Sequence, residues 1–144
     1  MVCALGSYCF PQHASILKVG YVAAIGTKLS DTFGSEIGKA FGRSTYLITT
    51  MRMVPRGTEG AVSVEGTLAG IVGSILIAVL AYSLQVLPTI DSALCCIAAA
   101  FVATTIESYI GAVFQDKVSW LNNELVNLIM TVIGAVLAMS FVRV

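Results

Sequence analysis

Charged residues are scarce in this chain of 144 residues. Lysine, arginine, aspartate and glutamate together make up 11% of it, whereas hydrophobic residues make up 57%. A soluble domain averages about 25% charged residues, so this composition excludes an ordinary soluble protein and indicates an integral membrane protein. The eight basic and eight acidic residues give a formal net charge of zero. The balance gives no reason to expect nucleic acid or a strongly charged partner.

Metal-ligating side chains are also few. The chain has one histidine, His13, and its four cysteines, at positions 3, 9, 95 and 96, form no CxxC pair. Zinc needs ligands at spacings that let the side chains converge, and this set does not provide them. We therefore expect the cysteines to be small apolar residues of the core.

Targeting features are absent from the first fifteen residues, which contain no lysine or arginine and no sustained apolar region. They resemble neither a secretory signal peptide nor an arginine-rich transit peptide. If the protein acts in an organelle, one interpretation is that this chain is a truncated or alternative product that lacks its N-terminal part.

Long apolar stretches make up most of the remaining chain. Since a transmembrane helix needs about 20 residues, the length predicts an all-α integral membrane protein with about four transmembrane helices and one polar glycine-rich loop. We expect a single transmembrane domain over residues 1–144. Its predicted parts are a short polar N-terminus (1–13), a first helix (14–42), a polar loop (43–66) and transmembrane helices at 67–87, 93–114 and 121–142.

Lysine and arginine are concentrated on one side of these predicted spans. The segment from Lys28 to Arg56, together with Lys117, falls on one side and Arg143 on the other. The positive-inside rule places the polar loop in the cytosol or in an organellar equivalent such as a stroma. The chain returns to this side near Glu107 and leaves it again through the polar residues 122–127. We therefore expect polar residues of separate segments to converge at one end of the bundle.

Two acids lie in otherwise apolar surroundings, Asp31 and Glu107. An ionised acid within a span costs about 2.5 to 3.5 kcal/mol on insertion scales. Such a residue normally faces a polar cavity or a partner, which makes both acids candidates for a site. The alternative for Glu107 is that it extends from the helix end to the membrane interface.

A glycine-rich run, Pro55 to Gly60, leads through Ser63 into the beginning of a predicted helix. Helix beginnings present unpaired N–H groups and suit phosphate, although an ordinary loop with turn glycines would look the same. The run GSEIGKA is not a Walker A loop, because three residues separate its glycines and no serine or threonine follows the lysine. The glycines at 34, 38 and 42 favour helix packing. The residues alone thus indicate an anion site with a carboxylate at a membrane face.

Four runs, SDTFGSEIGKAFG, VPRGTEGAVSVEGTLAG, ESYIGAVFQ and WLNNELVNLI, resemble in this order the membrane family that contains the phytyl-phosphate kinase of plant vitamin E synthesis. The resemblance extends from about Ile25 to the end. More distantly, the chain is similar to CTP-using dolichol kinases and membrane cytidylyltransferases. Family members usually have further spans upstream, so one interpretation is that the chain is a truncated C-terminal part of a larger helical bundle.

The resemblance implies phosphoryl transfer from a nucleoside triphosphate, CTP being the first candidate, to an isoprenyl monophosphate such as phytyl phosphate. The product would be the diphosphate used for tocopherol and related isoprenoids, made in a chloroplast membrane. Asp31 would hold Mg²⁺, while Lys39 and Arg56 would neutralise charge on the phosphoryl oxygens. The implied substrate-binding residues are Ser35, Gly57, Thr58, Glu59, Gly60, Ser63, Glu107, Asn123 and Asn127.

Two other interpretations stay open at this point. In the first, the protein is a small transporter or channel component in which Asp31 and Glu107 mark an ion path. In the second, it is a non-catalytic packing subunit or truncated isoform. Assembly into a homo-oligomer is also left open by the sequence.

Overall fold

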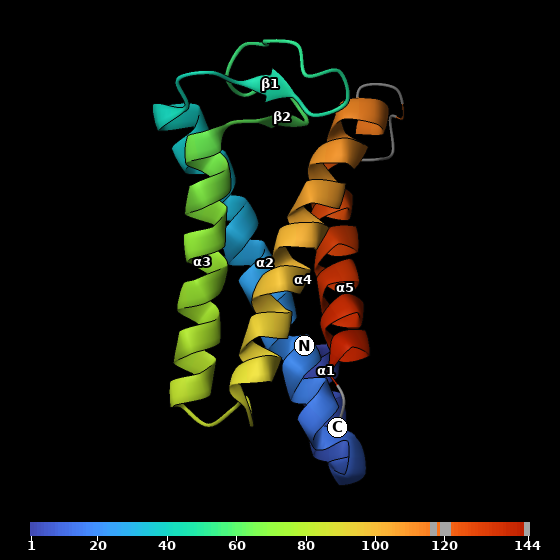
Figure 1. Cartoon of the computed structure of the whole chain (residues 1–144). Coiled ribbons are helices and arrows are strands. Elements are labelled where there is room, and N and C mark those ends of the chain that lie inside the picture. The colour runs from blue at the N-terminus through green and yellow to red at the C-terminus, as the bar shows by residue number, and fades with distance from the viewer. Residues whose placement is uncertain (116–117, 119–121, 143–144) are drawn as a thin grey trace.

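The computed structural model describes residues 1–115, 118 and 122–142, and it is mainly helical, as predicted (Figure 1). Lys117 and Arg143, on which the predicted orientation partly depends, lie outside the described residues. The elements are α1 (Val2–Cys9), a 3₁₀ turn (Pro11–His13), α2 (Ala14–Phe41), β1 (Tyr46–Leu47), β2 (Ala61–Val62), α3 (Val64–Ser83), α4 (Ile90–Ile110), a π-helical turn (Gly111–Gln115) and α5 (Asn123–Phe141).

Three helices of the described chain are long and apolar enough to cross a membrane. They are α3, α4 with its extension to Phe114, and α5. The first predicted span corresponds to α2, which has 28 residues and contacts α1, α3, α4 and α5. It does not meet the same standard because it carries five charged residues: Lys18, Lys28, Asp31, Glu36 and Lys39. The bundle therefore combines three apolar helices with one long, charged helix that touches them all.

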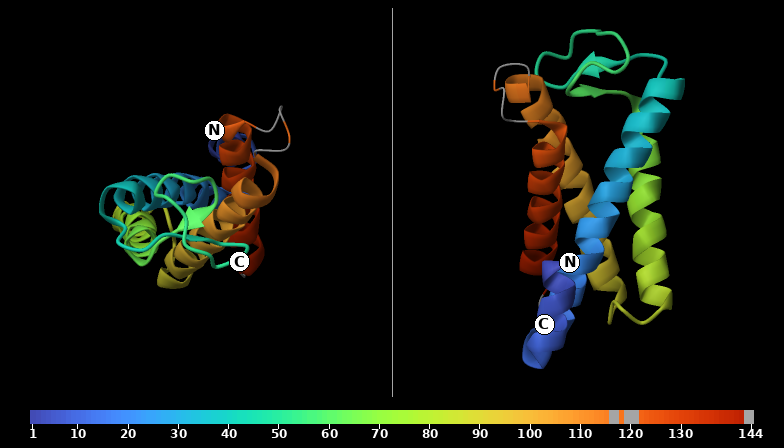
Figure 2. Two further views of the ribbon diagram at one scale, coloured as in Figure 1. Left: turned by 90° about the horizontal axis from the view of Figure 1, so that it is seen from above. Right: turned by 180° about the vertical axis from the view of Figure 1, so that it is seen from behind.

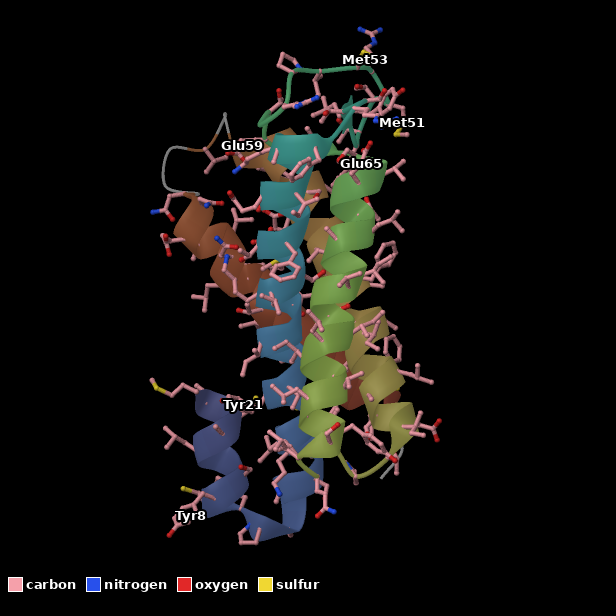
Figure 3. The ribbon with its side chains drawn as sticks, turned by 90° about the vertical axis from the view of Figure 1, so that its left-hand side faces the viewer. Tyr8, Tyr21, Met51, Met53, Glu59 and Glu65 are labelled. Atoms are coloured by element: carbon pink, nitrogen blue, oxygen red, sulfur yellow. The ribbon has the colours of Figure 1, made fainter. Side chains whose placement is uncertain are left out.

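The N-terminal segment differs from the short polar stretch predicted for residues 1–13. It contains a helix, α1, which folds back against the beginning of α2 (Figure 3). Gly6 of α1 lies next to the Leu17 side chain. Pro11 separates the two helices, because proline restricts the residue before it, and Phe10 has φ −125° and ψ 77°. A helix of two turns is too short for its periodicity to be recognised in a sequence.

The apolar core lies at the end of the bundle away from the strands. Val19 and Ala23 of α2 pack there with Leu87, with Ala99 of α4 and with Ala138 of α5. Of the four cysteines, one is buried in this core, at position 96, while those at 3 and 95 are half-buried and that at 9 is exposed. The expectation that all four belong to the core is therefore wrong for the one at the exposed end of α1.

Side-chain caps set the helix beginnings. Both α3 and α4 begin three residues earlier than predicted, because polar residues just before them accept hydrogen bonds from the first turn. The Ser63 hydroxyl accepts from the Gly66 N–H, and Thr89 and Ser92 form a reciprocal capping box. At its other end α3 stops four residues early, and Gln85 just beyond it has a left-handed φ of 56°. Hydropathy depends on the apolar residues, so it does not predict helix ends that are set by polar residues.

Glycines hold α2 and α3 close together. A Cβ added to Gly66 would lie 2.6 Å from the Gly34 carbonyl oxygen, and one added to Gly70 would lie 3.0 Å from the Ser30 carbonyl oxygen. Small residues at such contacts let helix backbones approach each other. The helix-packing interpretation is thus correct for Gly34, and the first turns of α3 are fixed against the second half of α2.

The predicted polar loop forms a small hairpin across one end of the bundle (Figures 1 and 2). In it β1 pairs antiparallel with β2, Tyr46 opposite Val62. Gly60, which has φ 71°, lies so close to the Ser108 carbonyl and to Ala112 that a Cβ would collide with both. A residue without a side chain at this position therefore lets the hairpin rest on the end of α4.

Candidate functional site

Beneath the hairpin lies a polar cavity of about 400 Å³. Its wall consists of the second half of α2, the beginning of α3, the second half of α4, the beginning of α5 and the hairpin. Figure 3 shows Glu59 in the hairpin, at the same end of the bundle as Glu65 at the beginning of α3. The polar residues of separate segments thus meet at one end, as the predicted topology requires.

Every predicted site residue except Arg56 lines this cavity. Helix α2 contributes Asp31, Ser35 and Lys39. Helices α4 and α5 contribute the predicted side chains nearest the hairpin. The complete set is Asp31, Ser35, Lys39, Gly57, Thr58, Glu59, Gly60, Ser63, Glu107, Asn123 and Asn127. The fold therefore brings residues that are far apart in the sequence around one space.

Arg56 has a different environment from the one expected. Its guanidinium donates a hydrogen bond of 3.3 Å to the Ala40 carbonyl oxygen in the last turn of α2. The last carbonyls of a helix have no partner within the helix, so they attract such a donor. The structure thus places Arg56 at the outer end of α2 and not in the lining of the cavity.

A lysine that the sequence analysis did not select links two helices at the cavity. Lys28 Nζ lies 3.1 Å from Asp31 Oδ2 on α2 and donates a hydrogen bond of 2.8 Å to Asn127 Oδ1 on α5. Its side chain is 48% exposed, whereas that of Asp31 is 17% exposed. The available sequence signal was the three-residue spacing to Asp31, which places the two charges on one helix face.

Carboxylates outnumber cations around the cavity. Asp31, Glu36, Glu59 and Glu107 line it, against Lys28 and Lys39. Lys39 forms an ion pair of 3.5 Å with Glu36, and both of these side chains are largely exposed. The interior of the cavity is thus acidic, so an anionic ligand would need an accompanying cation to bind there.

Glu107 lies in the cavity wall as a half-buried carboxylate. Within the described residues it has no hydrogen-bond or ion-pair partner. Thr104, one turn earlier on α4, and Ser108 line the same space and were not selected from the sequence. This position favours the polar-cavity interpretation of Glu107 over extension to the membrane interface.

The hydroxyl groups among the implied substrate-binding residues differ in their availability as hydrogen-bond donors. Ser35 donates to the Thr32 carbonyl at 3.2 Å, and Thr58 donates to the Pro55 carbonyl at 2.8 Å. A hydroxyl has one proton to donate, so both donors are already engaged. Ser63 instead accepts from a backbone N–H, which leaves its proton for another acceptor.

This arrangement defines a class: helical integral membrane proteins with a polar, acid-lined cavity at one end of the bundle. The chain belongs to the family of integral membrane proteins called DUF92. The sequence model of this family matches residues 1–135. Membership confirms the predicted integral membrane location. No solved structure matches the chain.

Three relatives show the extent of the similarity. An uncharacterized membrane protein of Synechocystis sp. is 50% identical over 96% of this chain and 54% of its own length. The chloroplastic protein VTE6 of Arabidopsis thaliana is 47% identical over 93% of this chain and 40% of its own, and an uncharacterized membrane protein of Methanocaldococcus jannaschii is 40% identical over 83% and 49%. These matches confirm the predicted family resemblance, and the chain spans about half the length of these relatives.

Proposed function

We propose that the chain carries the site of a membrane prenyl-phosphate kinase. It would transfer a phosphoryl group from a nucleoside triphosphate, first of all CTP, to an isoprenyl monophosphate such as phytyl phosphate. The observation that carries this proposal is a cavity lined by carboxylates from α2, α4 and the hairpin together with lysines of α2 and the glycine-rich turn. Similarity to VTE6 supports the proposal and supports a chloroplast membrane as the location.

The donor set of the cavity fits a magnesium ion that arrives with phosphates. Mg²⁺ prefers oxygen ligands, keeps several waters and is usually held by one or two carboxylates plus substrate phosphates. The described residues contain no group of three or more acidic, histidine or cysteine side chains that could hold a metal by themselves. Asp31 and Glu107 are the carboxylates that would hold the ion, which when bound would neutralise charge on the phosphoryl oxygens.

The residues of the chain would mainly position the two substrates, since phosphoryl transfer depends on positioning and electrostatics. Lys39 lies where it can attract a phosphate entering under the hairpin, and the free proton of Ser63 can be donated to a phosphoryl oxygen. Phe101 of α4 lines the cavity and is 44% exposed. Its ring marks an apolar exit through which an isoprenyl tail would reach the surrounding lipid.

The test is phosphoryl transfer by the purified, lipid-reconstituted chain, given labelled CTP and phytyl phosphate with and without Mg²⁺. We expect metal-dependent phytyl diphosphate, and a loss of about 100-fold or more in Asp31→Asn, because a metal contact is worth several kcal/mol in the transition state. Asp91→Asn is the matched control, since Asp91 is exposed in the first turn of α4, outside the cavity lining.

Unchanged activity in a folded Asp31→Asn variant would remove this carboxylate from the mechanism. VTE6 is assayed in parallel as a reference. Product from VTE6 alone would mean that the part of VTE6 not spanned by this chain is needed for activity. If neither protein forms product, the half-buried carboxylate of Glu107 favours transport instead. Ion flux into vesicles that is lost in Glu107→Gln would then establish that function.

A further inference from the structure

Lys28 of α2 lines the cavity, as does Lys39. It sits about halfway along α2, and its ammonium contacts a carboxylate oxygen of Asp31 and an amide oxygen of Asn127. The other lysine of the wall, Lys39, is three turns further along the helix and paired with Glu36. A lysine within a membrane bundle is costly and normally has a functional partner.

The two oxygens around the ammonium are of the kind that a divalent cation prefers. Asp31 provides a carboxylate and Asn127 an amide carbonyl, both hard oxygen ligands. They come from different helices, α2 and α5, and the ammonium joins them. Lys28 Nζ thus occupies a position between oxygens that would also suit a metal ion.

The lysine side chain can leave this position, since its stem has four flexible carbons and is 48% exposed. Other charged groups of the wall are Glu36 and Lys39 on α2, Glu59 in the hairpin and Glu107 on α4. If a phosphate entered together with a metal, the ammonium would be attracted to the anion and repelled by the second cation. Both forces act in the same direction.

We propose that Lys28 is an exchangeable cation: in the ligand-free cavity its ammonium neutralises Asp31 and binds Asn127, and with a metal–phosphate ligand it binds a phosphate oxygen. Asp31 then passes from the ammonium to the metal. This inference rests on the proposed function, because it assigns a role within the same site. It makes Lys28 a phosphate-binding residue. Removing the lysine should therefore strengthen the binding of a metal ion alone and weaken the binding of phosphate.

The experiment compares Lys28→Met with the reconstituted wild-type chain, using Mn²⁺ and inorganic pyrophosphate as probes. Free Mn²⁺ is followed by electron paramagnetic resonance, and pyrophosphate binding in the presence of Mn²⁺ by calorimetry. We expect Mn²⁺ alone to bind about threefold more tightly or better, since a competing positive charge is gone. Pyrophosphate should bind about tenfold more weakly, since a charge-assisted hydrogen bond is lost.

Two further variants make the result decisive. Lys18→Met removes an exposed lysine of the same helix outside the cavity and should change neither affinity. Lys28→Arg keeps the charge and should retain most of the pyrophosphate binding. If Lys28→Met weakens both ligands, or changes neither, Lys28 is structural or uninvolved and the inference is overturned. If the wild-type chain itself binds neither probe, the proposed function fails, which is a different result.

Discussion

Replacing Gly66 with alanine tests whether glycine contacts set the distance between α2 and α3. The added Cβ would lie 2.6 Å from the Gly34 carbonyl oxygen and 3.2 Å from the Gly38 Cα. Both atoms belong to the backbone, so no side chain can rotate away to make room. The helices must separate locally, which moves the first turn of α3 away from the acidic part of α2.

The expected cost follows from these contacts. Overpacking a well-packed site costs about 1–3 kcal/mol, and alanine recovers up to about 1 kcal/mol through its higher helix propensity. A net loss of about 1–2 kcal/mol is therefore expected. Gly26→Ala is the matched control: Gly26 is also buried in a helix, but its added Cβ would lie 3.8 Å from Ile77, an ordinary contact. This variant should be as stable as the wild type or more stable.

The free energy of unfolding is measured by titrating the reconstituted protein with sodium dodecyl sulfate and following helix content by far-ultraviolet circular dichroism. Gly66→Ala should unfold at lower detergent and form less product than the wild type. Wild-type stability in this variant would refute the reasoning, as would equal destabilisation by Gly26→Ala. The second result would mean that Gly66 is needed for helix flexibility and not for the close approach of the two backbones.

Two further predictions concern the hairpin. Gly60→Ala should lower product formation and speed protease cleavage of the hairpin, because the new Cβ collides with Ala112. Gly57→Ala is the control, since Gly57 has a positive φ of 84° but open space around it. It should lose less activity, and equal losses would mean that backbone strain and not the collision explains the effect. Arg56→Ala should keep kcat/KM within about twofold of the wild type, because Arg56 binds the end of α2 outside the cavity. A loss of about tenfold in kcat/KM, equivalent to about 1.4 kcal/mol, would show that Arg56 enters the site during turnover.

The helical spans could be predicted because hydropathy adds up along a chain. An uncharged run such as residues 67–83 of α3 is recognisable wherever it occurs, and the fold follows from packing a few such runs. The beginnings of α3 and α4 were missed because they depend on single hydroxyl groups, those of Ser63 and Thr89, whose effect is local. The short α1 was missed for lack of length.

The site was partly predictable for a related reason. Asp31 and Glu107 are conspicuous because an acid in an apolar run needs an explanation. Lys28 was used only for the predicted orientation, since its partner Asn127 is 99 residues away and their contact exists only in the folded chain. The family resemblance implied a role for Arg56 at the phosphoryl oxygens, but a resemblance in sequence does not determine on which side of a turn a long side chain lies.

The glycine contact between α2 and α3 also determines how tolerant the gene can be of insertions. Each residue added to an α-helix rotates everything beyond it by about 100°. On α2 the packing residue Gly34 and the polar residues Lys28, Asp31 and Ser35 share one helical register. An insertion between the core residues Val19 and Ala23 and this group would therefore turn the polar row and the glycine contact together out of register with the core, whereas the hairpin around Thr49 can change length without turning any helix.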